Sequence, residues 1–268
     1  MKYFKLQAGD RIPAIGFGTY TLKGKKGVRM IEAALEIGYR HLDTAEMYRN
    51  QPEIARAIKN SSVDRDDLFI TSKVWHNHLQ AGDVKEACAK TLAELQTDYV
   101  DLYLIHWPNP QVPVNETLQG MNELKEEGKI RNIGVSNFTI SHLKEVETIN
   151  GAVIVNNQVE YHPYFNREKL RRYCEEQNII LSAYCPVARG EIFGDSVLQE
   201  IGERHGKNEA QVTLRWMIDK GIVVLPRSAN PAHIAQNIEL FDFELSADEV
   251  ERIDNIEEEN RLVEPFFK

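Results

Sequence analysis

The sequence predicts an α/β fold of the (β/α)8 or TIM-barrel class, in which eight strands alternate with helices. Short apolar runs bounded by turn residues, which are typical of buried strands, alternate with segments whose apolar residues recur at helical spacing. This alternation continues through all 268 residues, and no linker or low-complexity segment interrupts it. We therefore expect a single domain that spans residues 1–268.

The first half of the chain is expected to hold four strand–helix pairs. The strands are predicted at residues 15–18, 41–43, 68–73 and 99–106. The helices that follow them are predicted at residues 27–37, 52–59, 84–95 and 114–127. The third helix shows the helical period most clearly, through Val84, Ala87, Cys88, Leu92 and Leu95. Gly128 stands at the C-cap of the fourth helix, where glycine commonly ends a helix.

The second half repeats this order. Strands are predicted at residues 130–135, 154–158, 179–184 and 222–225. Helices are predicted at residues 140–149, 167–177, 196–205, 209–220 and 231–240. Ser246-Ala247-Asp248-Glu249 has the form of a capping box and predicts the start of a last helix. The tail at residues 259–268 is expected to be irregular.

An open doubly wound sheet is the competing fold. That fold commonly carries Gly-x-Gly-x-x-Gly at its first strand–helix turn. Here Gly16-Phe17-Gly18 is followed by Thr19-Tyr20-Thr21, so the third glycine is absent. The barrel is therefore the favoured prediction.

Charge and composition argue against several classes of function. The formal net charge is -9 and no basic stripe stands out, which disfavours nucleic-acid binding. The short run Lys23-Gly24-Lys25-Lys26 is interpreted as a solvated loop. No stretch approaches the ~20 apolar residues that a membrane helix needs, and the N-terminus lacks the apolar core of a secretory signal. The three cysteines show no pairing pattern, which predicts reduced thiols and a cytoplasmic protein.

Four polar side chains lie at or just beyond the ends of three successive predicted strands. Asp43, Lys73 and His106 occupy the strand ends, and Tyr48 lies in the loop after the second strand. Active sites of such barrels form at the carboxyl ends of the strands. The sequence therefore predicts that an acid, a phenol, an amine and an imidazole converge there.

This combination suits the reduction of a carbonyl group by hydride. Tyr48 can supply the proton that the carbonyl oxygen needs, although a free phenol with a pKa near 10 donates weakly at neutral pH. Lys73 is the cation expected to lower that pKa, and Asp43 would pair with Lys73. His106 can hydrogen-bond the substrate oxygen and orient it.

Each residue also has an ordinary structural explanation. Asp43 could cap a helix, Tyr48 could be a loop aromatic, and Lys73 could be a surface charge. His106 could be a histidine at the barrel rim. The joint placement of the four favours catalysis. Metal binding is not expected, because the neighbouring pair His76 and His78 has no acidic or cysteine partner at zinc spacing.

Six ordered motifs resemble the signatures of the aldo-keto reductases, and the resemblance covers essentially the whole chain from Ile15 to Ser246. Within this family, the chain most resembles the bacterial group of 2,5-diketo-D-gluconate reductases and methylglyoxal reductases. The motifs are Asp43-Thr44-Ala45-Glu46-Met47-Tyr48-Arg49-Asn50, Ile70-Thr71-Ser72-Lys73-Val74-Trp75, Leu104-Ile105-His106-Trp107-Pro108, Gly134-Val135-Ser136-Asn137-Phe138, Asn157-Gln158-Val159-Glu160-Tyr161-His162-Pro163 and Ala183-Tyr184-Cys185-Pro186.

The resemblance implies a catalytic tetrad of Asp43, Tyr48, Lys73 and His106, with Tyr48 as the proton donor. It also implies a set of residues around a nicotinamide cofactor, with the ring against Tyr184 and its amide on Ser136, Asn137 and Gln158. The remaining implied cofactor residues are Gly18, Thr19, Asp43, Arg227, Ser228, Asn230, His233, Gln236 and Asn237. The predicted substrate wall consists of Phe17, Tyr20, Tyr48, Trp75, His106, Trp107 and the tail from Asn260. These residues also have structural alternatives. Ser136 and Asn137 could cap the following helix, and Gln158 could be a polar group in the barrel interior.

The sequence departs from the family pattern at three positions. Gln51 stands where glutamate is usual, Arg227 where lysine is usual, and His233 where arginine is usual. The last two positions hold the 2′-phosphate of NADPH in the family. Arginine can replace lysine as a phosphate donor, whereas an imidazole, mostly neutral near pH 7, gives a weaker contact. NADPH is therefore the expected cofactor, with some use of NADH.

The predicted function is NAD(P)H-dependent reduction of small polar aldehydes, ketones or keto acids, such as 2,5-diketo-D-gluconate or methylglyoxal. The resemblance also suggests a monomer. Two hypotheses stay open beside it. Some relatives are subunits of potassium channels, so the chain could be a catalytically weak, cofactor-binding regulatory subunit. A barrel aldolase could instead use Lys73 as a Schiff base, which a protonated amine beside Asp43 disfavours.

Overall fold

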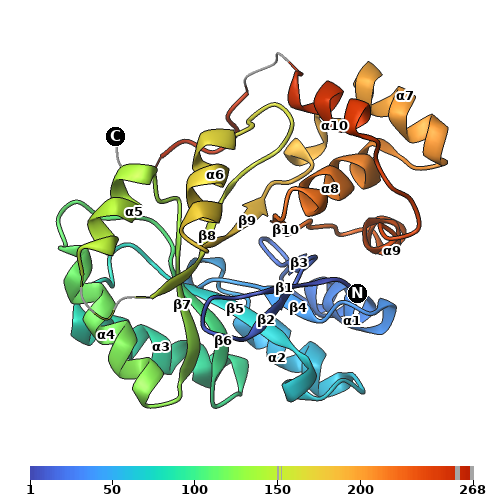
Figure 1. Cartoon of the computed structure of the whole chain (residues 1–268). Helices are drawn as coiled ribbons and strands as arrows, with labels where there is room; N and C mark the ends of the chain where they lie inside the picture. Colours follow the sequence, from blue (N-terminus) through green and yellow to red (C-terminus); the bar gives the residue numbers. More distant parts are fainter. Residues whose placement is uncertain (150, 152, 257–259, 266–268) are drawn as a thin grey trace.

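A parallel eight-stranded sheet, curled into a barrel, forms the centre of the protein (Figure 1). We describe it from a computed structural model, which describes residues 1–149, 151, 153–256 and 260–265. The strands follow one another round the sheet in chain order. Its two edges meet where the Gly16 amide donates to the Val224 carbonyl at 2.9 Å and the Val224 amide donates to the Ala14 carbonyl at 3.0 Å. The (β/α)8 barrel predicted from the sequence is confirmed, since a doubly wound sheet would reverse its strand order.

The strands of the barrel are parallel to their neighbours, so their carboxyl ends open on one side. The barrel strands are β3 (Phe17–Gly18), β4 (His41–Asp43), β5 (Phe69–Val74), β6 (Val100–Ile105), β7 (Ile130–Ser136), β8 (Ile154–Glu160), β9 (Ile180–Tyr184) and β10 (Val223–Val224). The first and last are shorter than predicted, because the chain around Ile15 pairs with β10 only through an isolated bridge.

Helices surround the barrel, and the main hydrophobic core fills the layer between them and the strands. The helices are α1 (Gly24–Ile37), α2 (Gln51–Asn60), α3 (Ala81–Leu95), α4 (Val114–Glu126), α5 (Ile140–Glu147), α6 (Glu168–Glu176), α7 (Ser196–His205), α8 (Glu209–Asp219), α9 (Pro231–Ile238) and α10 (Ala247–Asp254). Short 3₁₀ turns are η1 (Glu46–Tyr48), η2 (Arg65–Asp67) and η3 (Ala188–Gly190). Among the described residues, no helix has the length and apolar character to cross a membrane.

Local chemistry explains several helix boundaries. The predicted capping box opens α10: the Glu249 amide donates to Ser246 Oγ, and the Ser246 amide donates to a Glu249 carboxylate oxygen. The C-cap of α4 is Glu127, so Gly128, predicted at the C-cap, lies one residue later, in the left-handed region at φ 72°. The predicted start of α1 was wrong, because the helix begins at Gly24. Lys25 and Lys26 therefore lie in its first turn rather than in a loop. The predicted irregular tail is confirmed at residues 260–265, while residues 259 and 266–268 lie outside the described residues.

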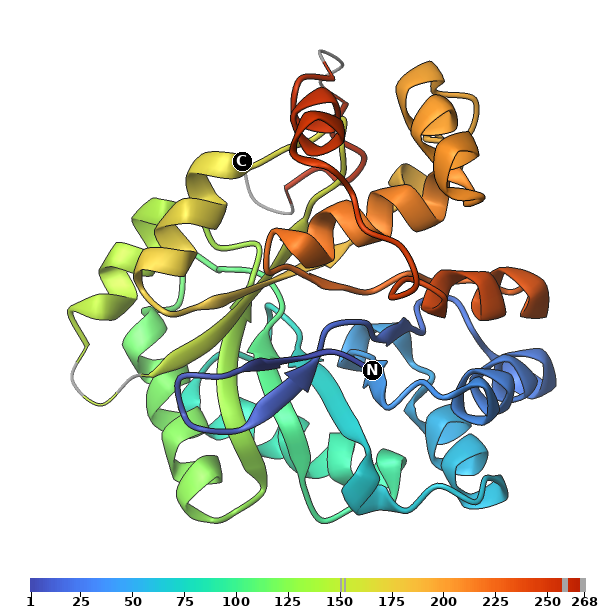
Figure 2. The same ribbon diagram turned by 45° about the vertical axis from the view of Figure 1, so that its right-hand side comes forward.

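An N-terminal hairpin, which the sequence analysis did not predict, closes one end of the barrel. Strands β1 (Tyr3–Lys5) and β2 (Arg11–Pro13) pair antiparallel, and Figure 2 shows them lying across the barrel. Leu6 and Ile12 from this hairpin are buried against apolar side chains that fill the barrel interior, namely Phe69, Leu102, Leu104, Val155, Val223 and Leu225. This end is therefore sealed by apolar packing, and the polar groups are left for the opposite end.

Gly134→Ala is expected to destabilise the protein. A β-carbon at Gly134 in β7 would lie 2.5 Å from Leu104 Cδ2 and 2.8 Å from the Asn156 carbonyl oxygen. Relieving such overpacking typically costs about 1–3 kcal/mol, which equilibrium denaturation would measure. Gly82→Ala in α3 is the control, because nothing lies within 4 Å of its β-carbon. An unchanged stability of Gly134→Ala would contradict the close packing of β6, β7 and β8.

Candidate active site

The structure brings the four predicted catalytic residues together at the carboxyl ends of the barrel strands. Asp43 ends β4, Lys73 lies near the end of β5, and His106 directly follows β6. Tyr48 ends the 3₁₀ turn η1, which follows β4. Asp43, Lys73 and His106 are buried, and Tyr48 is half-buried. The ends of adjacent parallel strands therefore place these groups as the sequence predicted.

Lys73 is the centre of this group. Its side chain is fully buried, and Nζ donates to Asp43 Oδ2 at 2.7 Å. Nζ also donates to the Thr44 carbonyl at 2.8 Å and to the Tyr48 hydroxyl at 3.3 Å. Burial lowers the pKa of Lys73, and the Asp43 carboxylate opposes that shift. The three contacts use all the N–H donors of an ammonium group. Asp43 is thus an ion-pair partner, and the helix-cap alternative does not apply.

The phenol of Tyr48 holds its proton firmly. Burial raises the pKa of Tyr48 well above the ordinary value of 10.0, and the Asp43 carboxylate raises it further. The expectation that Lys73 gives Tyr48 a lowered pKa is therefore wrong in its net direction. The physical reason is that burial removes the phenolate from water and that the negative charge of Asp43 lies nearby. Tyr48 is protonated at neutral pH, and Lys73 contacts the oxygen on which charge develops when that proton leaves.

His106 is held as a neutral imidazole. Burial lowers its pKa well below the ordinary value of 6.5, and the charge of Lys73 lowers it further. Its ring packs edge-on at 5.8 Å from the Tyr48 ring and 5.0 Å from the Trp75 ring. The Nδ1 atom is buried and has no hydrogen-bond partner among the described residues. An uncharged imidazole, which carries one N–H donor, therefore lies beside the phenol.

The four residues expected around the nicotinamide form a hydrogen-bonded network beside the tetrad. Tyr184 OH donates to Asn137 Oδ1 at 2.8 Å, and Asn137 Nδ2 donates to the His106 carbonyl at 3.0 Å. Ser136 Oγ donates to the Gln158 carbonyl at 2.8 Å. Gln158 Nε2 donates to Asp43 Oδ1 at 2.7 Å, which joins the network to the tetrad.

These contacts bear on the two structural alternatives. Helix α5 is capped by Thr139, so Ser136 and Asn137 do not cap it. Asn137 adopts φ 64°, a left-handed conformation that asparagine tolerates better than most residues. Gln158 is buried, and its amide contacts a tetrad carboxylate rather than only the barrel interior. The network offers neutral donors and acceptors together with an aromatic side chain, which suits a nicotinamide amide and ring.

Two buried amides hold the loops that carry the tetrad, and their roles were not predicted. Asn50 Nδ2 donates to the carbonyls of Thr19 and Leu22, and its Oδ1 accepts from Thr44 Oγ1 at 2.9 Å. Gln51 accepts from Ser72 Oγ at 3.0 Å and donates to Glu94 at 2.9 Å. Where the family usually has a glutamate, the neutral side chain of Gln51 therefore links Ser72 to Glu94 on α3 through hydrogen bonds. Only the motif Tyr48-Arg49-Asn50-Gln51 itself signalled these positions.

The segment from Arg227 to Asn237 lies beside the turn that follows β3. Gly18 donates its amide to the Pro226 carbonyl at 3.0 Å, and Thr19 Oγ1 donates to the Asp43 carbonyl at 2.8 Å. Arg227 is exposed, and its guanidinium donates to the Tyr20 carbonyl and to Thr21 Oγ1. These two contacts orient the guanidinium and leave some of its five N–H donors for an anion.

The start of α9 carries the other predicted cofactor residues. Asn230 is its N-cap and accepts from the Ala232 amide at 3.0 Å. Ser228 Oγ accepts from the Asn230 amide at 3.1 Å. His233 and Gln236 are exposed, whereas Asn237 is buried. Asn230, and not His233, therefore caps the N-terminus of α9.

Comparison with known proteins agrees with this geometry. Residues 14–258 match the Aldo/keto reductase family. The chain belongs to the aldo/keto reductase family. It is 38% identical to "Methylglyoxal reductase DkgA" of Escherichia coli (strain K12) over 261 residues, 96% of this chain and 94% of that protein. It is 40% identical to "Glyoxal reductase" of Bacillus subtilis (strain 168) over 259 residues, 96% and 94% of the two chains.

Solved structures of aldo/keto reductases share the fold. The reductase MGS-M4 from a Medee basin deep-sea metagenome library superposes with a TM-score of 0.96 at 35% identity, over 99% of this chain and 98% of that one. The aldo-keto reductase AKR2E5, solved in complex with NADPH, gives a TM-score of 0.93 at 32% identity, over 98% and 90% of the two chains.

Aromatic side chains line part of the tetrad in this aldo/keto reductase. The Tyr20 ring, which is 52% exposed, lies 5.0 Å from the Tyr48 ring, and Trp75 packs on His106. Trp107 is nearly buried directly after His106. Phe17 does not join them, because its buried ring packs 5.5 Å from Tyr39 in the layer beneath α1. The expectation that Phe17 lines the substrate wall is therefore corrected to a packing role.

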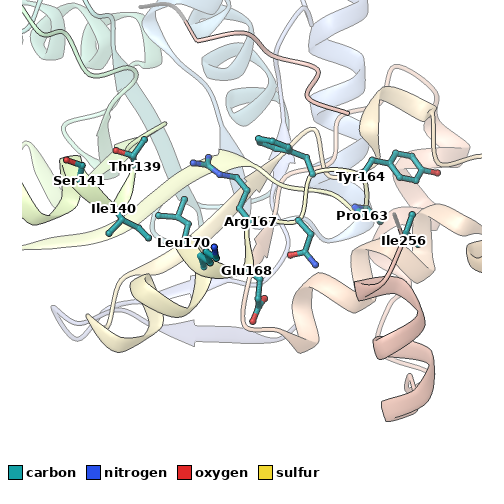
Figure 3. A pocket seen from close by; sticks show the side chains of 12 residues that line it. Thr139, Ile140, Ser141, Pro163, Tyr164, Arg167, Glu168, Leu170 and Ile256 are labelled. Carbon is teal, nitrogen blue, oxygen red and sulfur yellow. The ribbon is translucent and has the colours of Figure 1, made fainter. Parts of the chain in front are cut away.

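The structure shows two further features away from the tetrad. His78 Nδ1 bonds Glu46 Oε1 at 2.7 Å, and the described residues hold no group of three or more His, Cys, Asp or Glu side chains that could bind a metal. An open depression of about 780 Å³ lies between the start of α5 and the β8–α6 loop (Figure 3). None of the tetrad residues lines it.

Proposed function

We propose that this protein reduces small polar aldehydes and ketones to alcohols with a reduced nicotinamide cofactor. The observation that carries the proposal is the buried Lys73, which contacts both Asp43 and the Tyr48 hydroxyl beside the neutral His106. The relatives described as methylglyoxal reductase and glyoxal reductase support small 2-oxoaldehydes as substrates. Keto acids such as 2,5-diketo-D-gluconate are the second substrate class in this proposal.

In this proposal Tyr48 is the general acid. Its phenol keeps a proton at neutral pH and transfers it to the substrate oxygen as negative charge develops there. Lys73 stabilises the phenolate that remains, and Asp43 compensates the charge of Lys73. His106, held neutral by burial, donates a hydrogen bond that fixes the substrate oxygen beside Tyr48. The rings of Tyr20 and Trp75, which pack on Tyr48 and His106, would form part of the wall around the substrate.

The residues present fit a nicotinamide cofactor. Ser136, Asn137 and Gln158 would hold its amide, and Tyr184 would offer a stacking face. The bound cofactor supplies the hydride. The expected cofactor is NADPH, and the neighbour solved with NADPH supports that choice. A cytoplasmic, monomeric chain acting as one domain over residues 1–268 belongs to the same proposal.

The geometry disfavours the aldolase alternative. A Schiff base needs an uncharged amine with a lone pair directed at the substrate. Lys73 Nζ already donates to Asp43, Thr44 and Tyr48, so its N–H groups point at protein acceptors. Borohydride trapping in the presence of a carbonyl substrate is expected to leave the chain unmodified.

Substrate rates test the proposed function. We expect saturable oxidation of NADPH with methylglyoxal, and measurable rates with 2,5-diketo-D-gluconate and with aromatic aldehydes. Initial rates over this panel, each with NADPH and with NADH, would rank the classes. If none of the carbonyl compounds supported turnover, carbonyl reduction would be the wrong function.

His233→Arg is expected to increase the preference for NADPH over NADH. The 2′-phosphate carries roughly two negative charges at pH 7, and Arg227 alone meets it with a fixed charge. Wild type should therefore prefer NADPH modestly. One added charge-assisted contact of about 1.5 kcal/mol corresponds to about a tenfold change in the ratio of kcat/KM values for the two cofactors.

The control for this prediction is Ala232→Arg, which adds the same charge at an adjacent exposed position on another side of α9. It is expected to change the ratio much less. Equal ratios in wild type and His233→Arg would show that position 233 does not meet the phosphate.

A further inference from the structure

The side chain of Glu46 joins two loops that carry different parts of the candidate active site. Glu46 begins the 3₁₀ turn η1, which ends at Tyr48. Its Oε2 atom accepts from the amide of Trp75, the residue directly after β5, at 2.9 Å. Its Oε1 atom bonds His78 Nδ1 at 2.7 Å. Both carboxylate oxygens of Glu46 therefore link the loop after β4 to the loop after β5.

This link is largely shielded from water. The side chain of Glu46 is 13% exposed, and that of His78 is 42% exposed. Hydrogen bonds that are shielded from water are stronger, and a buried acceptor that loses its donor is destabilising. His78 Nδ1 carries a proton in one neutral tautomer as well as in the charged ring. The link therefore does not require a charge on His78.

The loop that carries Trp75 forms a tight turn held from two directions. The His78 amide donates to the Trp75 carbonyl at 2.9 Å, which closes the turn. Asn109 Nδ2, from the loop after β6, donates to the His76 carbonyl at 2.9 Å. Glu46 holds the turn from the loop after β4. Of these two anchors, Glu46 is the one that shares a 3₁₀ turn with the proposed general acid.

The position of this turn determines the space beside His106. The Trp75 ring packs edge-on at 5.0 Å from the His106 ring, and the Tyr48 ring packs edge-on at 5.8 Å from the same imidazole. A shift of the Trp75 main chain would therefore change the room for a substrate at His106. Functional side chains keep a productive geometry when neighbouring residues lock them in place. Glu46 provides such a lock through the Trp75 amide.

We propose that Glu46, together with His78, is a positioning residue that fixes Trp75 relative to Tyr48 and so favours small carbonyl substrates over bulky ones. A fixed wall rejects a large substrate because the wall cannot yield, whereas a small substrate fits without displacing it. Glu46 acts through Trp75 and not on the substrate. This inference rests on the proposed reductase function, but the position of Trp75 can be measured without turnover.

Acrylamide quenching of tryptophan fluorescence tests the position of Trp75 in the absence of substrate. The chain has three tryptophans, of which Trp107 and Trp216 are buried and Trp75 is half-buried. An increase in quenching would therefore report mainly on Trp75. We expect such an increase in Glu46→Ala. Glu46→Gln keeps an oxygen acceptor for the Trp75 amide and should restore quenching close to that of wild type.

Steady-state rates with methylglyoxal and with benzaldehyde, at saturating NADPH, test the effect on specificity. Glu46→Ala is expected to raise the KM for methylglyoxal about three- to tenfold, the effect of losing a hydrogen bond that holds the wall. Its kcat should be essentially unchanged. The KM for benzaldehyde should rise less, because the bulky ring no longer meets a fixed wall. The preference for methylglyoxal, as a ratio of kcat/KM values, should therefore fall about threefold or more.

His78→Ala should change this ratio in the same direction. Because both side chains act through one contact, the double variant Glu46→Ala with His78→Ala should add little to the effect of Glu46→Ala alone. If Glu46→Ala fails to fold in a thermal melt, His78→Ala carries the test, since His78 is the more exposed member of the pair.

Glu53→Ala is the matched control. Glu53 on α2 also accepts from a main-chain amide, that of Gly24 at 2.8 Å, but this contact holds the start of α1. We expect both KM values of this variant to stay within about twofold of wild type. Its tryptophan quenching should be unchanged.

Three outcomes would overturn the proposal. The first is unchanged quenching and an unchanged substrate ratio in both Glu46→Ala and His78→Ala. The second is a fall in kcat at constant KM, which would show that Glu46 acts through Tyr48 instead of Trp75. The third is an equal change in Glu53→Ala, which would indicate general loosening. A wild type that reduces neither aldehyde would refute the proposed function, while quenching would still decide whether Glu46 fixes Trp75.

Discussion

Tyr48→Phe is expected to lower kcat for carbonyl reduction by roughly 10²- to 10⁴-fold, the usual contribution of a general acid. The substitution removes the phenolic proton and the contact with Lys73 Nζ at 3.3 Å. It keeps the ring, which packs on Tyr20 and His106 and lies 4.9 Å from Lys73 Nζ. Cofactor affinity should therefore stay unchanged, and steady-state rates with fluorescence titration of NADPH measure both quantities.

The matched control is Tyr20→Phe, the same change on the ring that lies 5.0 Å away. We expect less than about a tenfold loss of kcat, because Tyr20 is exposed and offers no general acid to the substrate oxygen. Retention of more than a tenth of wild-type kcat by Tyr48→Phe would remove Tyr48 as the proton donor.

Lys73→Met is expected to have the second largest effect. Proton donation by Tyr48 leaves a phenolate in a buried site where the phenol already has a raised pKa. Without the ammonium group that phenolate loses its charged hydrogen-bond donor, and kcat should fall by roughly 10²- to 10³-fold, as when an oxyanion-hole donor is removed. The loss should persist from pH 6 to pH 9, because the phenol stays protonated throughout; a pH–rate profile measures it.

Lys73→Met also leaves Asp43 buried without its ion-pair partner, which typically costs about 3–5 kcal/mol of stability. The double variant Asp43→Asn with Lys73→Met removes both charges and should recover much of that stability in a denaturant melt. Its activity should stay low, because the cation beside Tyr48 is still missing. A double variant with near wild-type kcat would show that Lys73 serves only the fold.

The periodicity of the sequence predicted the barrel because each strand and helix carries its own apolar pattern. The N-terminal hairpin was not predicted, because its strands are three residues each and too short to show an alternation of apolar and polar residues. Its stability comes from Leu6 and Ile12 against the barrel interior, which is a tertiary contact. Phe17 was misplaced for a related reason: the sequence locates it on a strand end but does not show which face its ring takes.

The sequence could predict which residues meet at the candidate site, but it could not predict their pKa values. Asp43, Lys73 and His106 follow apolar strands, so parallel pairing alone brings them together. The raised pKa of Tyr48 depends on its burial and on the nearby charge of Asp43, which no sequence pattern carries. The contacts of Arg227 with Tyr20 and Thr21, and of Glu160 with the tail, join residues far apart in the chain.

The central claim is that the tetrad performs carbonyl reduction, and it has a direct test. The purified chain is mixed with NADPH and methylglyoxal, the oxidation of NADPH is followed, and the reduced product is identified. We expect NADPH oxidation that requires the aldehyde, saturates with its concentration and yields one alcohol per NADPH consumed. Tight NADPH binding without aldehyde-dependent oxidation would contradict this account and favour a cofactor-binding regulatory subunit of the same fold.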